Sequence, residues 1–139
     1  MIMSADNGSM NNRRLDALIR EIGTEVDGQF GFWRFDVHGK HLVCITDESL
    51  DRIRIMTQIT ERGQLSSELI YACMEANYEC ALDARYCIDD DILWGAFMHP
   101  LRSLQEKQFR SACKQVAEIA SNFGTTFSSG ELRFGCDLE

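Results

Sequence analysis

The sequence predicts an α+β fold with the order α-β-β-β-α-β-β-α, in which flanking helices pack on an antiparallel five-stranded sheet. The spacing of apolar residues carries most of this prediction. It changes along the chain between three to four, typical of amphipathic helices, and two, typical of strands with one buried face. The segments of period two are joined by short polar turns, which are typical of hairpins.

The first helix is predicted to begin near residue 11. Asn11 or Asn12 can cap its free amide groups, and Gly23 ends it. Its apolar residues recur at helical spacing: Leu15, Leu18, Ile19 and Ile22. Residues 1–10 are small and polar without a period, so we expect a disordered leader before the domain.

Three strands are predicted next, at about residues 30–37, 40–46 and 52–59. Gly39 can supply the positive φ of a tight hairpin between the first two. In the third strand, isoleucines alternate with mostly polar residues, including two arginines. This alternation predicts a sheet with one face on the core and one face in water.

A second helix and a second hairpin follow. Ser66 can cap the helix, and Asn77 is predicted to close it. Strands are expected at about residues 81–88 and 92–98, joined by a turn of aspartates at 89–91.

The last helix is predicted after Pro100, where residues 103–106 (Ser-Leu-Gln-Glu) match a capping box. Its apolar stripe is the most continuous in the chain: Phe109, Cys113, Val116, Ala120 and Phe123. We therefore expect a single domain over residues 11–123, followed by a C-terminal tail at 124–139 that can pack on the domain.

Composition limits the classes of partner. The 139 residues are 45% hydrophobic and 26% charged, with a net charge of −8. An acidic surface repels phosphate backbones and anionic lipids, so we expect neither nucleic acid nor membrane as a partner. With no signal peptide or spanning run in the sequence, we expect a cytoplasmic protein.

No catalytic or metal-binding signature is present in the sequence. The six cysteines include no CxxC pair, so we expect buried thiols that act as small apolar residues, without metal or cofactor. The aspartates at 89–91 lack the spacing of a calcium loop. His41 and Cys44 are three apart on a strand and would face opposite sides of it. We therefore expect a protein that is not an enzyme.

Three segments resemble the type III secretion chaperone-like superfamily, in its YbjN-like and CesT-like branch. They are residues 74–77 (Met-Glu-Ala-Asn), 81–86 (Ala-Leu-Asp-Ala-Arg-Tyr) and 93–101 (Leu-Trp-Gly-Ala-Phe-Met-His-Pro-Leu). Residues 123–130 resemble an uncharacterised bacterial subgroup of it. The resemblance covers about residues 10–130 and implies a small acidic homodimer that holds an extended segment of a client protein.

Two functions remain open at this point. The first is a non-enzymatic, chaperone-like module that binds a protein or peptide client. The alternative is a YbjN-like regulatory or ligand-sensing domain in bacterial signalling or stress response, which would have a concave pocket with convergent polar groups. The candidates for partner or dimer contact are Trp33, Arg52, Arg54, Met56, Tyr71, Tyr78 and Trp94.

Overall fold

The computed structural model describes residues 8–79, 81–123, 126–128 and 131–133. The helices are α1 (Asn12–Ile22), the short 3-10 helix η1 (Arg62–Gln64), α2 (Ser67–Glu79) and α3 (Glu106–Ser121). The strands are β1 (Thr24–Gln29), β2 (Phe32–Val37), β3 (Lys40–Asp47), β4 (Arg52–Glu61), β5 (Arg85–Asp89), β6 (Ile92–Pro100), β7 (Thr126–Ser128) and β8 (Glu131–Arg133). The order of helices and strands confirms the predicted α+β class.

The main sheet has six strands in the order β1-β2-β3-β4-β6-β5, and every neighbouring pair is antiparallel. Five strands were predicted, so the number was one too low. The additional strand is β1, whose sequence Thr-Glu-Val-Asp-Gly-Gln lacks an alternation of apolar residues and which is mostly exposed. The strands β7 and β8 form a separate two-stranded sheet.

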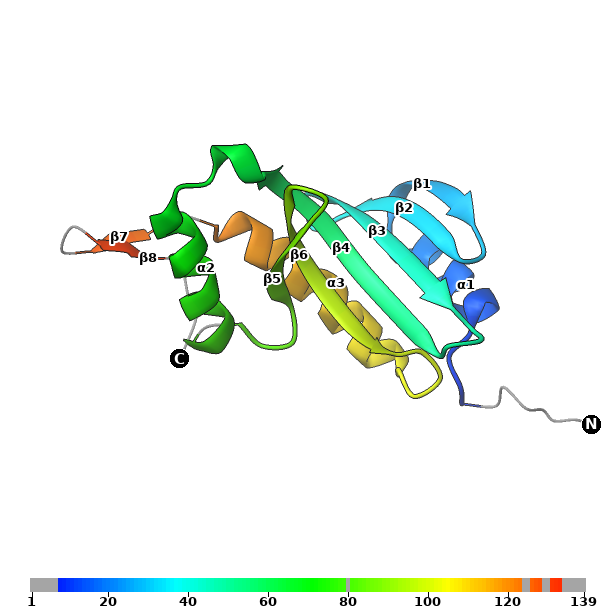
Figure 1. The fold of residues 1–139 in the computed structure, drawn as a ribbon. Helices are drawn as coiled ribbons and strands as arrows, with labels where there is room; N and C mark the ends of the chain where they lie inside the picture. Colours follow the sequence, from blue (N-terminus) through cyan, green and yellow to red (C-terminus); the bar gives the residue numbers. More distant parts are fainter. Residues whose placement is uncertain (1–7, 80, 124–125, 129–130, 134–139) are drawn as a thin grey trace, which may run out of the picture.

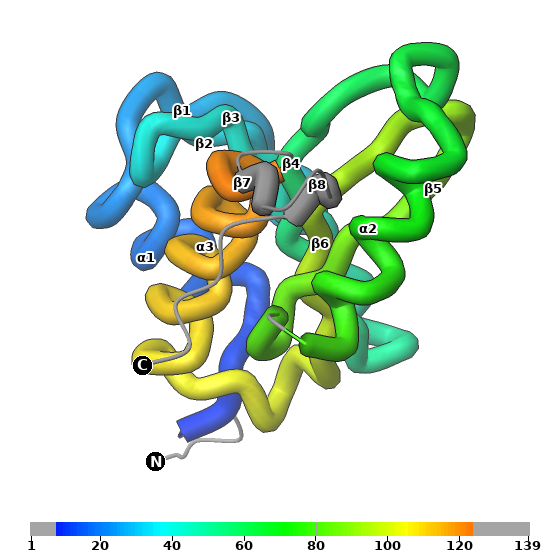
Figure 2. The backbone as a smooth tube through the Cα atoms, turned by 90° about the vertical axis from the view of Figure 1, so that its left-hand side faces the viewer, coloured from blue at the N-terminus to red at the C-terminus, as the bar shows by residue number. Residues whose placement is uncertain are grey.

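The helices α1 and α3 lie on the same face of the main sheet, behind it in Figure 1 and to one side of it in Figure 2. Between the helices and the sheet lies the core, whose largest fully buried side chains include Trp33, Phe35, Leu42, Ile53, Ile55 and Phe109. The predicted alternation in β4 is confirmed, because its isoleucines at 53 and 55 are buried while Arg52 and Arg54 are exposed.

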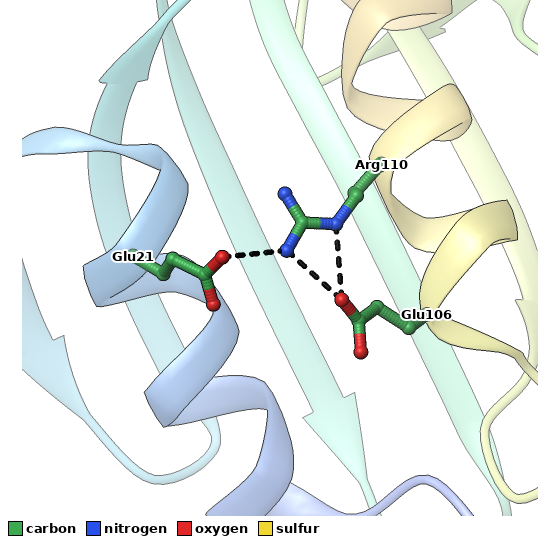
Figure 3. A network of polar contacts seen from close by, with 3 residues as sticks. All are labelled: Glu21, Glu106 and Arg110. Atoms are coloured by element: carbon green, nitrogen blue, oxygen red, sulfur yellow. Dashed lines mark hydrogen bonds and ion pairs between the residues drawn. The ribbon is translucent and has the colours of Figure 1, made fainter.

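An arginine on α3 joins the two covering helices (Figure 3). The guanidinium of Arg110 donates to Glu21 of α1 at 2.8 Å and to Glu106 of its own helix at 2.9 and 3.1 Å. These hydrogen bonds raise the pKa of Arg110, with the bond to Glu21 as the largest cause. The network ties the end of α1 to the start of α3.

The helix caps agree only in part with the prediction. The Arg14 amide donates to the side chain of Asn11, and the Leu69 amide donates to Ser66 Oγ, as predicted. The capping box of α3 lies two residues later than expected, because Gln105 is the N-cap and exchanges hydrogen bonds with Gln108.

The N-terminal boundary of the folded part includes residues that were assigned to the leader. Met10 is 2% exposed and belongs to the core, and its amide donates to the carbonyl oxygen of Arg102. Residues 1–7 of the leader lie outside the described residues, as do most of those in the C-terminal tail.

Candidate protein-binding surfaces

The face of the main sheet opposite α1 and α3 is not covered by any helix of the described residues (Figure 1). We call it the helix-free face. It is formed by the outward residues of the strands, which alternate with the buried ones. On β2, β3, β4 and β6 these include Phe32, Arg34, Val43, Ile45, Arg52, Arg54, Met56, Trp94, Ala96 and Met98.

The strand register sets these side chains in rows across the sheet. One row runs Arg34, Val43, Met56, Ala96, Arg85, so that two arginines flank three apolar residues. Its centre is buried, because Met56 is 9% and Ala96 3% exposed although no described helix covers them. The longer side chains of neighbouring residues therefore shield these two apolar residues from solvent.

The next row runs Phe32, Ile45, Arg54, Met98 and places its cation in the middle. Met98 is 46% and Phe32 39% exposed, so this row presents more apolar surface to solvent. Arg54 therefore has an apolar residue opposite it on each neighbouring strand.

A second apolar surface lies on α2. Tyr71, Met74 and Tyr78 recur at i, i+3 and i+7 and are 66%, 65% and 90% exposed. The opposite side of the same helix buries Ala72, Cys73 and Ala76 in the core. A helix that is apolar on two sides is expected to have a partner on both. We call the outward side of α2 the aromatic stripe.

Both edge strands of the main sheet, β5 and β1, have features that hinder the pairing of a further strand. At the β5 end, the side chain of Asn77 in α2 pairs with the backbone of Tyr86: the Tyr86 amide donates to Asn77 Oδ1 at 2.8 Å, and Asn77 Nδ2 donates to the Tyr86 carbonyl at 3.1 Å. Asn77 was predicted to close α2, but the helix continues to Glu79 and Asn77 instead takes the place of a neighbouring strand.

At the other end, the register of β1 against β2 shifts between Thr24 and Asp27. Glu25 has a φ of 51° and Gly28 a φ of 119°. A Cβ at residue 28 would lie 2.3 Å from the Phe32 carbonyl oxygen, so the close approach of the two strands requires glycine there. Such an irregular edge is a poor template for another strand.

The structure separates the seven predicted contact residues. Arg52, Arg54, Met56 and Trp94 share the helix-free face. Tyr71 and Tyr78 lie on the aromatic stripe.

Trp33 has a different environment from the other candidates, because it is 0% exposed. Its Nε1 donates to the Asp16 carboxylate at 3.0 Å, and this bond is the largest cause of the lowered pKa of Asp16. A side chain with no exposed surface cannot touch a partner, so Trp33 is a core residue.

Several surface residues were not singled out from the sequence. Arg34, Ile45 and Met98 belong to the helix-free face, and Met74 belongs to the aromatic stripe. The rows depend on which strands pair and in which register, and the spacing of apolar residues within one strand does not predict this. For Met74 the signal was present, since it is three residues from Tyr71 and four from Tyr78.

A polar hollow lies where β6 continues beyond the start of β5. It has a volume of about 420 Å³ and is lined by Asp83, Arg85, Phe97, Met98, His99, Lys107, Gln108 and Ser111. Most of these side chains are exposed. The guanidinium of Arg85 donates to the carbonyl oxygens of Leu82 and Ala84, which hold it beside this hollow.

The thiols of the described cysteines are free. Burial raises the pKa of Cys73 and of Cys113 to about 12, and that of Cys44 well above its usual value. Cys87 is partly exposed, and burial is again the largest cause of its raised pKa. Within the part of the chain that the structure describes, His, Cys, Asp and Glu side chains form no group of three that could hold a metal.

No protein-family model matches the chain, and no curated protein matches it. The fold is similar to that of a chain in the solved HopA1-SchA chaperone-effector complex, with a TM-score of 0.59 and 12% sequence identity. The similarity covers 78% of this chain and 88% of that one. At this identity the likeness shows the fold alone, and it confirms the predicted chaperone-like fold. Among the described residues, no helix is both long and apolar enough to span a membrane.

Proposed function

We propose that this protein is a non-enzymatic, chaperone-like module that holds an extended segment of a partner protein and acts as a homodimer. The observation that carries this proposal is the helix-free face, where apolar side chains of β2, β3 and β6, among them Phe32, Ile45 and Met98, remain in contact with solvent. Exposed apolar surface of this kind is typical of protein-binding sites. The similarity to a chain of a chaperone-effector complex supports the same class of function.

The sheet face suits an extended client better than the sheet edges do. At the β5 end, Asn77 already occupies the backbone of Tyr86, and at the other end β1 is irregular. A segment laid over the strands can instead contact the partly exposed apolar side chains of the helix-free face, such as Phe32, Ile45 and Met98. No bond is made or broken in such binding.

The aromatic stripe is the surface that we assign to self-pairing. It lies on α2, which stands beside β5 at the end of the main sheet (Figure 1). Tyrosine and methionine are enriched in the centres of protein interfaces. A stable dimer would need to bury on the order of 1,000 Å² in total, so the contact must extend beyond these three side chains.

Self-pairing is tested by light scattering after size-exclusion chromatography. The wild type is expected to elute as a dimer, and a Tyr71→Ser, Tyr78→Ser double variant as a folded monomer. Glu118→Gln on the exposed side of α3 is the matched control and should remain dimeric. A wild-type monomer, or a double variant that still dimerises, contradicts this assignment.

Client binding is tested by retention from the native lysate, followed by hydrogen exchange on the purified complex. The retained polypeptide should slow exchange in β4 and β6, and Phe32→Asp with Met98→Asp should abolish retention without unfolding the protein. If this variant retains the same polypeptide equally well, the client binds elsewhere on the protein. A monomer that retains no polypeptide would count against the proposal as a whole.

The alternative, a YbjN-like regulatory or ligand-sensing domain, is supported by the polar hollow beside Arg85 and Lys107. Small-molecule sites usually enclose most of the ligand. Because most side chains around the hollow are exposed, it fits this role less well than the helix-free face fits a polypeptide. Thermal stabilisation of the wild type by small anionic metabolites, lost on Lys107→Glu, would favour the alternative.

A further inference from the structure

We propose that the helix-free face selects segments in which acidic side chains alternate with other residues and are followed by an apolar one, with Arg52 and Arg54 binding the carboxylates and Met56 the apolar side chain. This inference rests on the proposed function, because it names the chemistry of the client held on that face. The partner is identified by this pattern alone: acidic, any residue, acidic, any residue, apolar.

The spacing of β4 provides the match. Side chains on one face of a strand repeat every ~6.8 Å, and an extended client has the same repeat. Arg52, Arg54 and Met56 are successive outward residues of β4. A segment that follows this strand can therefore place one side chain over each of them, in order.

Arg54 has no acidic residue among its nearest neighbours on the helix-free face. Its opposite residues are Ile45 on β3 and Met98 on β6, and its neighbours on the same face of β4 are Arg52 and Met56. None of these four is acidic. Among the described residues no carboxylate forms an ion pair with Arg54, although the chain has 22 acidic residues and 14 lysines and arginines.

Arg52 does have a carboxylate opposite it, Asp47 on β3, but no ion pair forms. The Asp47 carboxylate instead accepts from Ser49 Oγ at 2.7 Å and from the Leu50 amide at 3.0 Å. These bonds lower its pKa, with Ser49 as the largest cause. Asp47 thus serves the β3–β4 turn.

The surroundings strengthen a charge-assisted contact at Arg54. A guanidinium binds a carboxylate through two parallel hydrogen bonds, and such bonds are stronger where apolar groups exclude water. Ile45, Met56 and Met98 provide apolar groups around the cation. The net charge of −8 repels an acidic segment from the rest of the surface. An acidic client therefore binds preferentially at the arginines of the helix-free face.

The test uses fluorescence anisotropy with two labelled synthetic peptides on the full-length protein. One carries the pattern Glu-Ser-Glu-Ser-Leu, and its control replaces both glutamates by glutamine. We expect the acidic peptide to bind at least ~10-fold more tightly at low salt, as a charge-assisted pair in a partly desolvated site predicts. The difference should shrink as ionic strength rises.

Substitutions of Arg54 test its contribution to the preference. Arg54→Glu should abolish the preference for the acidic peptide, and Arg54→Gln should reduce it without introducing a repulsive charge. Lys114→Glu, an equal charge reversal at an exposed position of α3, is the matched control and should leave the preference unchanged. Circular dichroism of each variant confirms that it is folded.

The outcomes separate this inference from the proposed function. Equal binding of the two peptides, or a preference that survives Arg54→Glu, overturns the inference but leaves client binding on the face intact. A short DNA that binds as tightly as the acidic peptide also overturns it, since the site would then be a general anion site. If neither peptide binds while the wild type still retains a polypeptide from lysate, the stated pattern is wrong and the proposed function stands.

Discussion

Replacing Asn77 by alanine tests whether one side chain really substitutes for a strand at the β5 end of the sheet. Asn77 lies in α2 and makes two hydrogen bonds to the backbone of Tyr86, of 2.8 and 3.1 Å. Both are partly buried. In Asn77→Ala, the amide and carbonyl of Tyr86 lose their side-chain partner next to the core.

The expected loss of stability follows from two opposing effects. Each hydrogen bond contributes about 0.5–1.5 kcal/mol, so the pair contributes about 1–3 kcal/mol. Alanine is the better helix former by roughly 0.6 kcal/mol, which offsets part of this loss. The free energy of unfolding should therefore fall by about 0.5–2.5 kcal/mol, and Tm by several degrees for a domain of this size.

Urea denaturation followed by circular dichroism measures this change, and hydrogen exchange locates it. The Tyr86 amide should exchange faster in the variant, whereas amides of β3 should exchange only when the whole domain unfolds. Glu75→Ala, at an exposed position of the same helix, should change stability by less than about 0.5 kcal/mol. An Asn77→Ala variant as stable as wild type, with unchanged exchange at Tyr86, would refute the strand-substitute role.

Three further predictions concern the core. Gly95→Ala should destabilise the protein by about 1–3 kcal/mol, measured by urea denaturation, because the new Cβ would lie 2.6 Å from Ile119 Cγ2 on α3. The hydrogen bond from Trp33 lowers the pKa of Asp16 in the folded protein. It therefore stabilises the fold at pH values above the pKa of Asp16 in the unfolded chain, and this contribution is lost as pH falls through the pKa of Asp16 in the folded protein. Trp33→Phe should make the free energy of unfolding less dependent on pH in the acid range. Site-resolved thiol labelling at pH 8 should modify Cys87 before the buried cysteines, and early labelling of those would contradict their raised pKa values. The protected set is Cys44, Cys73 and Cys113.

The period of apolar residues was sufficient to predict most of the sheet and all three long helices. It failed at β1, where Val26 is the only large apolar residue of a strand that lies at the edge and stays mostly exposed. Such a strand forms because β2 offers it a backbone to pair with, which no local pattern contains. The capping box of α3 was misplaced because Gln105 and Gln108 can form the same reciprocal bonds as the more usual serine and glutamate.

The face on which a contact residue lies was predictable where it followed from the alternation of side chains along one strand. Arg52, Arg54 and Met56 have the same parity on β4, and the structure places them on one face. Trp33 was not predictable in this way, since an aromatic residue on a strand can face either side, and its burial depends on the helices that pack on β2, including α1. The two rows across the sheet depend on pairing between strands far apart in the sequence, as with Arg34 and Arg85.

The side-chain pairing at Tyr86 and the irregular course of β1 also bear on how the protein behaves when it is concentrated. Open sheets aggregate when the last strand of one molecule joins the first strand of the next, and repetition of that step gives fibres. Here one terminal strand is partly occupied by Asn77, and the other is distorted around Glu25 and Gly28. Both ends of the main sheet are thereby protected from end-to-end polymerisation, while its helix-free face keeps apolar side chains exposed.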